Sequence, residues 1–327
     1  MSLSEFDIIE RYFRGLGVLR EELILGVGDD AALLRPSPGR VLALTMDTLV
    51  AGGHFPEDAP ADSVGHKALA VNLSDLAAMG AEPLGVLLSL TMPAFDGAWL
   101  AGFCEGFGAL AARHDVALMG GDTTRGPLSV TVQATGALAP GEALRRNGAQ
   151  PGDVVLVSGT LGDAAVGLWL WQRKGRGTDP QTAWLRNRLN RPEPRISLGR
   201  LLAGRAHAAI DISDGLLADL GHVLEASGVG ARIDADAVPV SAALRAVCPA
   251  GDARRYALAW GDDYELCASV DPAEADRLCR QAAELGVALT PVGRIVAGSG
   301  IELVDGAGRK LAAPGSGYRH FDGDGAG

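Results

Sequence analysis

The stretch DSVGHKALAVNLSDLAAMGAEPLGVLLSLT, residues 62–91, is the most informative part of the chain for the fold class. In its first part, residues 62–79, apolar side chains recur from Val64 at helical spacing and predict a helix. Leucines on the other faces indicate that this helix is buried nearly all round. Residues 84–91 form a short apolar run that predicts a strand. A buried helix followed by a strand is typical of layered folds that combine both elements.

The remainder of the chain continues this alternation of short apolar runs and longer helical stretches. We expect further helices at 5–15, 97–114, 161–173, 194–206, 214–227 and 272–285, and further strands at 41–46, 116–119, 128–138, 154–159, 208–212, 256–260, 264–270 and 288–296. The segment 139–153 is rich in proline and glycine and poor in apolar residues, which indicates a boundary. The sequence therefore predicts an α/β (α+β) protein with two domains, residues 1–139 and 140–327.

Charge and composition exclude several classes of partner. Acidic residues outnumber basic ones, 40 against 29, and give a formal net charge of −11. Nucleic acids and anionic membranes both require a basic face, so we expect neither as a partner. No apolar run reaches the roughly 18 residues of a membrane helix, and the N-terminus lacks the layout of a signal peptide. The four cysteines form no CxxC pair and no zinc spacing. These features predict a soluble protein of the cytoplasm.

Aspartates follow five of the apolar runs, mostly after glycine or another small residue. They are Asp29 and Asp30 in LILGVGDD, Asp47 in VLALTMD, Asp122 in VALMGGD, Asp211 and Asp214 in AAIDISD, and Asp262 and Asp263 in YALAWGDD. Turns favour aspartate for local reasons. Five such turns nevertheless favour carboxylates at the ends of buried strands, where α/β folds commonly bind ligands. Converging carboxylates repel one another unless cations lie between them, and oxygen ligands without Cys or His suit Mg²⁺.

Asp75 strengthens the case for a metal site. It continues the apolar stripe of the 62–79 helix, four residues after Val71. A buried carboxylate without a partner costs several kcal/mol, so Asp75 needs a cation, hydrogen bonds or a cavity. The alternative is that the helix tips into solvent near its end and exposes this side chain.

Three turns are candidates for binding phosphate. GGDTTRG, residues 120–126, is expected to be a turn whose N–H groups form an anion nest, with Asp122 as a metal ligand. SDG, residues 213–215, precedes an apolar helix, where it is either an N-cap or part of a phosphate site. Arg145 and Arg146 lie in glycine-rich sequence and either clamp phosphate or are solvated linker residues.

Other nucleotide-binding and catalytic motifs fit less well. The chain has no Gly-Lys pair, which excludes a Walker A loop, and it has no GxSxG. GVGDDA, residues 26–31, matches a dinucleotide-binding fingerprint with Asp47 about 20 residues later, which leaves a Rossmann dehydrogenase as an alternative. Asp29 and Asp30 would repel the pyrophosphate unless a metal lay between, so we favour a metal–nucleotide site. His54, in the glycine-rich AGGHF, is either a turn residue or a substrate contact.

Seven blocks of the chain, taken in order, resemble the thiamine-monophosphate kinase family. They are GVGDDAALL, TMDTLVAGGHF, HKALAVNLSDLAAMGAEP, GGDTTRGPL, NGAQPGD, IDISDGLLADLGH and GDDYEL, within residues 5–321. The family is related to aminoimidazole ribonucleotide synthetase, selenophosphate synthetase and hydrogenase-maturation proteins, which share its fold and an ATP site without a P-loop. The strings GGHF and KALAVNLSDLAAMGA favour the thiamine branch, and no cysteine of the selenophosphate synthetase kind precedes Cys104.

The resemblance implies two α/β domains, the first of which binds ATP and metal and pairs through its sheet in a homodimer. It implies transfer of the γ-phosphoryl group of ATP to thiamine monophosphate, giving thiamine diphosphate and ADP, with Mg²⁺ as cofactor. By the same resemblance, the positions that match metal ligands are Asp30, Thr45, Asp47, Asp75, Asp122, Asp211 and Asp214. Those that match nucleotide contacts are Gly121, Asp122, Arg146 and Ser213. Those that match substrate contacts are His54, Asp262 and Tyr318.

The chain departs from the family at a few positions. Met46 stands where related kinases often have Thr or Ser, so only its carbonyl could help to bind metal. Trp260 and Asp262 stand where Gly and Glu are common. The expected reaction is a direct in-line transfer assisted by several Mg²⁺ ions and by Arg146, because the acceptor phosphate is already ionised and needs no strong base. A phosphoribosyl-amidine cyclase, another ATP-using relative and a non-enzymatic nucleotide-binding module are the alternatives.

Overall fold

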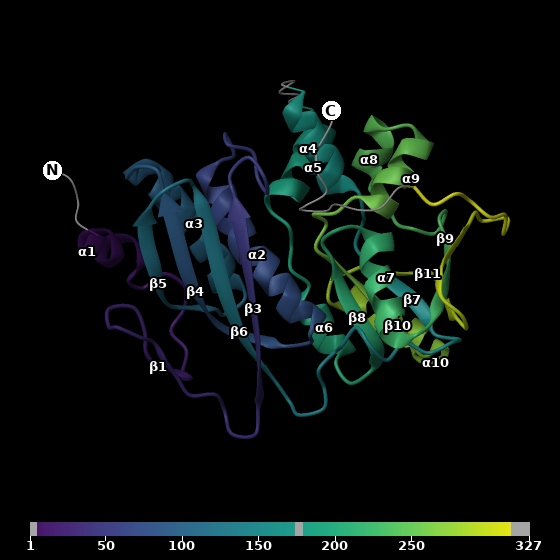
Figure 1. Ribbon diagram of the computed structural model, residues 1–327, viewed down its shortest axis with the longest axis horizontal. Helices are drawn as coiled ribbons and strands as arrows, with labels where there is room; N and C mark the ends of the chain where they lie inside the picture. The colour runs from purple at the N-terminus through teal and green to yellow at the C-terminus, as the bar shows by residue number, and fades with distance from the viewer. Residues whose placement is uncertain (1–4, 174–178, 315–327) are drawn as a thin grey trace. The chain divides into compact units, whose positions relative to one another are not determined.

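The computed structural model describes residues 5–173 and 179–314 of the chain. They fall into two compact units: unit 1 is Met1–Ala143 with Asn190–Arg200, and unit 2 is Leu144–Leu189 with Leu201–Gly327. Each unit is built on its own sheet with helices packed beside it (Figure 1), so the expected mixed α/β fold class is confirmed. Among the described residues, no helix combines the length and the apolar character needed to cross a membrane.

Unit 1 is built on a four-stranded sheet in the order β3 (Val41–Val50), β6 (Ser129–Leu138), β4 (Glu82–Met92), β5 (Ala117–Arg125). Strand β6 pairs antiparallel with β3 and β4, and β4 pairs parallel with β5. Helix α2 (Ala61–Ala78) packs against β3, β6 and α3 (Gly97–Arg113). The smaller elements are α1 (Glu5–Ile8), η1 (Ile9–Phe13), β1 (Leu23–Leu25) and β2 (Leu33–Leu34).

Helix α2 lies in the core of unit 1, as the pattern in residues 62–79 predicts. Leu69 and Leu73 are fully buried, and burial of each such side chain stabilises the fold by roughly 1.5–3 kcal/mol. Gly65 allows α3 to approach closely, because a Cβ there would lie 2.1 Å from the carbonyl oxygen of Phe103. The polar side chains of α2 are therefore held on a rigid support.

The face of the unit 1 sheet away from α2 is partly apolar. Burial alternates along the second half of β3, and Leu44 and Met46 are 67% and 66% exposed. Met46 pairs with Gln133 of β6, which pairs with Leu87 of β4, so the three residues form one row across the sheet. Leu87 is also exposed. Met46 thus lies on the opposite face of β3 from its neighbours Thr45 and Asp47.

Unit 2 is built on a six-stranded sheet in the order β12 (Gly300–Val304), β9 (Gly230–Asp234), β11 (Leu289–Val296), β7 (Val154–Ser158), β10 (Glu265–Val270), β8 (Ala206–Ile212). Only the β9–β12 pair is parallel. Helix α7 (Leu216–Ser227) contributes to the main core, and α10 (Pro272–Glu284) contacts β11 and β7. The other helices of unit 2 are α4 (Asp163–Gln172), α5 (Pro180–Asn190), α8 (Ala242–Val247) and α9 (Ala250–Ala259), whereas most of α6 (Ile196–Leu202) belongs to unit 1.

Two local expectations are wrong. Residues 256–260 were expected to form a strand, but α9 extends to Ala259, because Ala253 and Ala257 lie at helical spacing and are buried together. Residues 120–126 were expected to form a turn, but strand β5 continues through Arg125. The reason is that β4 pairs with β5 residue by residue as far as Met92.

The expectation that the aspartates end buried strands holds for one run only. Asp211 lies in β8, and Asp214 is the second residue after the strand ends at Ile212. Asp47 and Asp122 lie within β3 and β5, Asp29 and Asp30 follow the half-exposed strand β1, and Asp262 and Asp263 follow helix α9. The five apolar runs that end in aspartate therefore belong to different kinds of element in this chain, both strands and a helix.

Candidate functional site

The first group of candidate residues lies between β3 and α2 in unit 1. The hydroxyl of Thr45 donates a hydrogen bond to Oδ2 of Asp75. The backbone N–H of Asp47 donates to Oδ1 of Asn72 at 3.0 Å. The side chain of Asn72 is fully buried, and its amide nitrogen donates to the carbonyl of Ala68 at 3.1 Å. Asn72 thus joins β3 to α2 beside the two carboxylates, so that Thr45, Asp47 and Asp75 form one group.

The electrostatics of this group fit a divalent cation. Burial, with a further contribution from the negative charge of Asp75, raises the pKa of Asp47 from 3.8 to about 6. Two carboxylates and a hydroxyl are hard oxygen donors, and Mg²⁺ is commonly held by one or two carboxylates while it keeps several waters. Among the described residues, no three His, Cys, Asp or Glu side chains gather as a ready metal site. The donor set therefore fits Mg²⁺ that also binds water or phosphate oxygens.

Two predicted ligands in unit 1 lie away from this group. Asp122 is exposed on β5, at the opposite edge of the sheet from Asp47 on β3. With three strand spacings between these edges, the two backbones are about 14 Å apart. Asp30 is exposed in the segment between β1 and β2, where its N–H donates to Oδ1 of Asp29 at 2.8 Å. Within one chain, Asp122 therefore does not share a cation directly with Asp47.

His54 lies just after β3, and both its ring and its backbone carbonyl accept hydrogen bonds. Its Nδ1 accepts a hydrogen bond from the N–H of Val50 at 3.1 Å, so the neutral ring carries its proton on Nε2. Its carbonyl accepts a hydrogen bond from Nζ of Lys67 at 3.1 Å. Lys67 is buried on α2, on the same helix as Asn72 and Asp75. Helix α2 thus positions both the cluster of Thr45, Asp47 and Asp75 and the loop that carries His54.

The second group of candidate residues lies after β8 in unit 2. Asp211 is buried in the strand, and Ser213 and Asp214 are half-buried in the turn that follows. The carboxylate of Asp219, one turn into α7, accepts hydrogen bonds from the N–H groups of Asp214 and Gly215. Burial raises the pKa of Asp219 to about 7, although these hydrogen bonds act in the opposite direction. Two N–H groups of the turn are therefore already bonded within the protein.

The loop that carries Asp262 rests on the same turn. The N–H of Asp262 donates to the carbonyl of Ser213 at 2.8 Å, and the N–H of Tyr264 donates to the carbonyl of Ile212 at 2.9 Å. The hydroxyl of Tyr264 also donates to Oδ1 of Asp262 at 3.1 Å. The structure therefore brings together Asp262, Ser213 and Asp214, which come from distant parts of the sequence.

Buried charges lie beside this loop. Nη2 of Arg188 is 2.9 Å from Oε1 of Glu265, whose Oε2 accepts a hydrogen bond from Ser158 at 2.5 Å. Asp263 is almost completely buried, and its Oδ2 accepts a hydrogen bond from the N–H of Gly162 at 2.7 Å. Burial raises the pKa of Asp263 well above its usual value. The two adjacent aspartates thus differ, since Asp262 is half-buried on the loop while Asp263 points into the core.

Two further predicted residues are less constrained. Arg146 is exposed in unit 2, and its carbonyl accepts a hydrogen bond from the hydroxyl of Ser227 at 3.1 Å. Gly121 lies close to β4, since a Cβ there would be 1.8 Å from the carbonyl oxygen of Leu88. Tyr318 lies outside the described residues.

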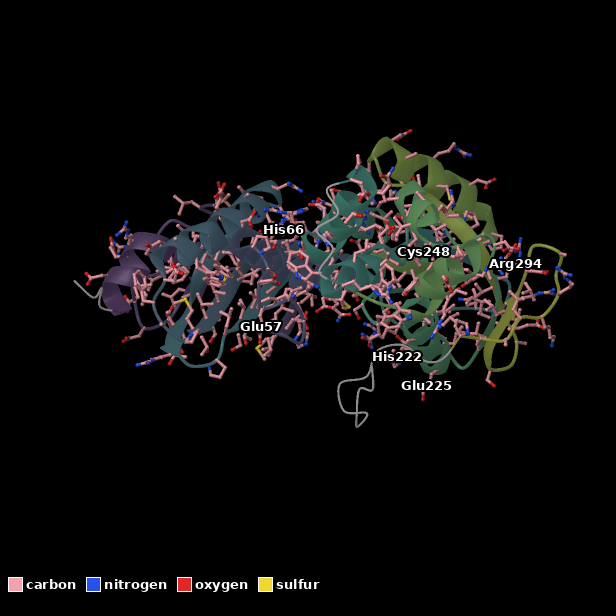
Figure 2. All side chains as sticks on the ribbon, turned by 90° about the horizontal axis from the view of Figure 1, so that it is seen from above. Glu57, His66, His222, Glu225, Cys248 and Arg294 are labelled. Carbon is pink, nitrogen blue, oxygen red and sulfur yellow. The ribbon has the colours of Figure 1, made fainter. Side chains whose placement is uncertain are left out.

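Sequence reasoning missed Asn72, Lys67 and Asp219 as parts of the site. A signal was present for each, because polar side chains stood in helices that otherwise read as apolar. Of the histidines labelled in Figure 2, His66 lies on α2 of unit 1 and His222 on α7 of unit 2. Nε2 of His66 is 2.9 Å from the carbonyl oxygen of Pro192, which indicates a structural role.

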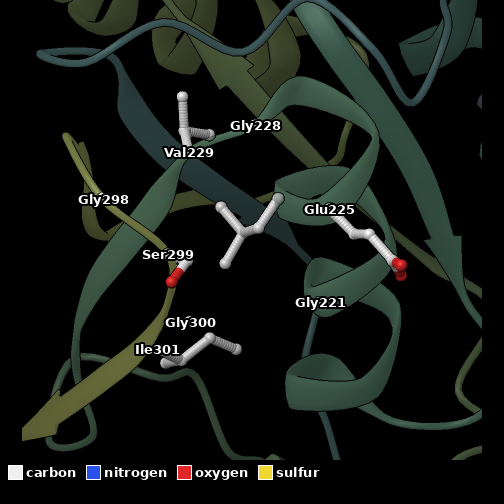
Figure 3. Close-up of a pocket in the computed structure, with 9 residues that line it drawn as sticks. Gly221, Glu225, Gly228, Val229, Gly298, Ser299, Gly300 and Ile301 are labelled. Atoms are coloured by element: carbon white, nitrogen blue, oxygen red, sulfur yellow. The ribbon is translucent and has the colours of Figure 1, made fainter.

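A pocket in unit 2 lies apart from these groups. It has a volume of about 460 Å³ and lies between α7 and the segment leading into β12 (Figure 3). Leu224, Val229 and Ile301 contribute apolar lining, and Glu225 is its acidic residue. Among the residues that the structure describes, no predicted site residue lines it and no cationic side chain is there for phosphate. The two polar groups described above are therefore the better candidates.

Comparison with known families identifies both halves of the chain. The family described as AIR synthase related protein, N-terminal domain, matches residues 28–138, and AIR synthase related protein, C-terminal domain, matches residues 150–306. Thiamine-monophosphate kinase of Salmonella typhimurium is 46% identical over 324 residues, which cover 98% of this chain and 99% of the relative. The Bacillus subtilis thiamine-monophosphate kinase is 35% identical over 305 residues, or 90% of this chain and 91% of the relative.

Solved structures give the same result. Thiamine-monophosphate kinase from Stenotrophomonas maltophilia has a TM-score of 0.86 at 50% identity and covers 93% of this chain and 97% of its own. AaThiL complexed with AMPPCP and TMP has a TM-score of 0.78 at 30% identity, with 98% and 99% covered. The hydrogenase maturation protein HypE of Escherichia coli shares the fold, with a TM-score of 0.76 at 22% identity and coverage of 95% and 98%.

Proposed function

The chain belongs to the thiamine-monophosphate kinase family, and we propose that it transfers the γ-phosphoryl group of ATP to the phosphate of thiamine monophosphate. The observation that carries this proposal is the near-complete coverage of relatives that bear that name, at up to 46% identity. A shared domain alone would not distinguish a kinase from the other ATP-using proteins of this fold. The AaThiL complex with AMPPCP, an ATP analogue, and TMP supports both substrates.

In this proposal Thr45, Asp47 and Asp75 hold Mg²⁺, and Asp30, Asp122, Asp211 and Asp214 are further ligands. The raised pKa of Asp47, caused chiefly by burial and further by the charge of Asp75, supports the assignment, because a bound cation would favour the ionised carboxylates against both effects. When bound, Mg²⁺ neutralises charge on the phosphate oxygens of the two reactants. Thr45 and Asn72 keep Asp75 and the backbone of Asp47 in place, so the donors need no rearrangement.

The remaining residues bind and orient the two substrates. The proposed contacts to ATP are Gly121, Asp122, Arg146 and Ser213. The proposed contacts to thiamine monophosphate are His54, Asp262 and Tyr318. The Nε2–H of His54 is a hydrogen-bond donor, which suits a phosphate or a pyrimidine nitrogen, and Asp262 suits the cationic thiazolium. Direct in-line transfer forms a bond from an acceptor phosphate oxygen to the γ-phosphorus, while the bond from that phosphorus to the β–γ bridging oxygen breaks. No residue of the chain needs to form a covalent intermediate.

We also propose that the chain forms a homodimer through the uncovered face of the unit 1 sheet. Leu44, Met46 and Leu87 are exposed on strands whose other face is buried by α2. Large apolar side chains gathered on one sheet face mark an interaction surface, and a second copy supplies a matching apolar face. Sedimentation of the protein at micromolar concentration tests this, and a monomer under those conditions would contradict it.

An acceptor panel tests the activity. ADP release and phosphorylated product are measured with ATP, Mg²⁺ and, in separate reactions, thiamine monophosphate, thiamine, the formylglycinamidine substrate of a cyclase, or selenide. We expect thiamine diphosphate from thiamine monophosphate and no product from thiamine, which lacks the acceptor phosphate. ADP release with another acceptor, or hydride transfer with NAD, would refute the proposal. Chelation of divalent cations should abolish turnover, and excess Mg²⁺ should restore it.

A further inference from the structure

The turn between β8 and α7 is held by one carboxylate oxygen. Oδ2 of Asp219 lies 3.0 Å from the backbone nitrogen of Asp214 and 3.0 Å from that of Gly215. Asp219 is only 3% exposed. Gly215 is the residue that precedes the first turn of α7 and has a φ of 121°, which favours glycine. The carboxylate of Asp219 therefore reaches back from inside the helix and fixes both the turn and the start of the helix.

This arrangement changes what the turn offers to a ligand. The N–H groups at the start of a helix are suited to bind anions, and the sequence left a phosphate site here as one of two alternatives, the other being an N-cap. The N–H groups of Asp214 and Gly215, just before the first residue of α7, donate instead to an internal carboxylate, which adds negative charge at that place. The turn is therefore suited to present the side chains of Ser213 and Asp214 rather than its backbone.

The same turn supports the loop that carries Asp262. A Cβ at Gly261 would lie 1.8 Å from the carbonyl oxygen of Ser213, and that oxygen accepts the hydrogen bond from Asp262. Asp262 has a φ of 68° and Tyr264 a φ of 50°, which are uncommon for residues other than glycine. A backbone of this kind is kept only where its surroundings determine it, and here those surroundings are the turn itself.

We propose that Asp219 is a positioning residue that sets the relative geometry of the nucleotide-binding and substrate-binding groups of unit 2. It acts as a hydrogen-bond acceptor for the 213–215 turn, and through Ser213 it sets the position of Asp262. This inference rests on the proposed function, in which Ser213 and Asp214 contact ATP and metal and Asp262 contacts thiamine monophosphate. It assigns to Asp219 no contact with either substrate.

The role of acceptor can be separated from the role of charge by two substitutions. In Asp219→Asn the amide oxygen can accept both hydrogen bonds, because a single oxygen accepts both in the parent protein. In Asp219→Leu the volume is similar but no acceptor remains. If the leucine variant fails to fold, Asp219→Ala removes the acceptor without adding volume.

Asp305 provides a matched control. It is 8% exposed, and its Oδ1 accepts hydrogen bonds from the N–H groups of Ala307 and Arg309 at 3.0 and 2.9 Å. It therefore holds a turn through two backbone hydrogen bonds, as Asp219 does, but after β12 and outside the proposed site. Asp305→Leu should lower the melting temperature and leave both Michaelis constants unchanged.

The measurements are kcat and the KM values for ATP and thiamine monophosphate, well below the melting temperature of each variant. We expect Asp219→Asn to stay within about threefold of the parent, and Asp219→Leu to raise both KM values about tenfold, as loss of two hydrogen bonds predicts. Equal impairment of the asparagine and leucine variants would overturn the inference, because the charge would then be required. Parent-like KM values in Asp219→Leu would also overturn it.

A binding experiment separates this inference from the proposed function. If the parent protein released no ADP with thiamine monophosphate, the proposed function would fail. Calorimetric titration with AMPPCP and Mg²⁺ still compares the variants in that case. Weaker binding by Asp219→Leu than by Asp219→Asn supports the positioning role, and equal binding by both variants refutes it.

Discussion

Replacement of Asp47 by asparagine should make the metal-free protein more stable at neutral pH. The pKa of Asp47 rises from 3.8 to about 6, chiefly through burial and further through the charge of Asp75. The folded protein therefore holds this proton more tightly than the unfolded chain does. The resulting stabilisation is complete below pH 3.8 and is lost as the pH rises through about 6. A rise of this size in the pKa corresponds to roughly 3 kcal/mol. Because solvent screens the partly exposed Asp47, we expect about 2 kcal/mol of it in the free energy of unfolding.

Thermal unfolding with chelator present, at pH values from 4 to 8, measures this effect. Since about 1 kcal/mol shifts the midpoint by roughly 2–4 °C in a unit of this size, Asp47→Asn should melt about 4–8 °C above the parent at pH 7.5. At pH 4 the two should melt together, because Asp47 is then protonated. Asp276→Asn, which removes an exposed carboxylate from α10, is the control for a change in net charge and should show no such dependence.

Addition of Mg²⁺ completes the test. At pH 7.5 the cation should raise the melting temperature of the parent and have much less effect on Asp47→Asn, because one of the two carboxylates is gone. Turnover of the variant should fall although its fold is more stable. If Asp47→Asn is less stable than the parent at pH 7.5, or if the difference is the same at pH 4, the argument from burial and repulsion is wrong.

Four further predictions concern other parts of the chain. Arg146→Lys keeps the charge but loses the planar guanidinium, so the KM for ATP should rise or kcat fall; parent-like kinetics in Arg146→Ala would make this loop a linker. Tyr318→Ala should raise the KM for thiamine monophosphate several-fold and leave that for ATP unchanged, because an aromatic ring on a cation contributes about 0.5–2 kcal/mol; equal losses for both would assign Tyr318 to stability. Asp263→Asn keeps the acceptor for Gly162 and removes a buried carboxyl with a raised pKa, so its stability relative to the parent should increase as the pH rises above 3.8; a melting temperature below the parent at pH 8 would contradict this. Met46→Asp places a charge on the uncovered sheet face and should shift a dimer towards monomer in sedimentation, whereas an unchanged molecular mass would exclude that face as the interface.

Much of the fold could be predicted from the sequence where one pattern dominated. Residues 62–79 predicted α2, which spans Ala61–Ala78, because apolar residues on every face allow only a buried helix at that length. A strand was wrongly predicted at residues 256–260, because the sequence YALAW is compatible with a strand and with the end of a helix. Packing against neighbouring helices favours the helix in the folded protein. A turn was wrongly predicted at residues 120–126, because glycine disfavours a strand only weakly. Pairing with the neighbouring strand β4 is enough to keep these residues in β5.

The candidate site could be predicted in part. The sequence and the family resemblance together indicated Thr45, Asp47 and Asp75, and the structure brings these three together through β3 and α2. The pairing of Ser213 with the Asp262 loop needed the fold, because about 50 residues separate them and the contact runs through backbone atoms. Asp219 stands among apolar residues of its helix, but spacing alone does not show that its partners are the N–H groups of Asp214 and Gly215.

Unit 1 is discontinuous in the chain, and this has a consequence for biosynthesis. Its helix α2 packs against a segment that is translated only after the first 45 or so residues of unit 2: a Cβ at Gly199 would lie 2.0 Å from the carbonyl oxygen of Ala77, and His66 bonds to Pro192. A nascent chain that ends at Ala143 therefore lacks residues 190–200, which pack against α2 in the folded unit. Unit 1 can close only when Arg200 has left the ribosomal exit tunnel, by which time unit 2 has begun to emerge. The first residues of unit 2 therefore leave the ribosome before the last segment of unit 1 is available.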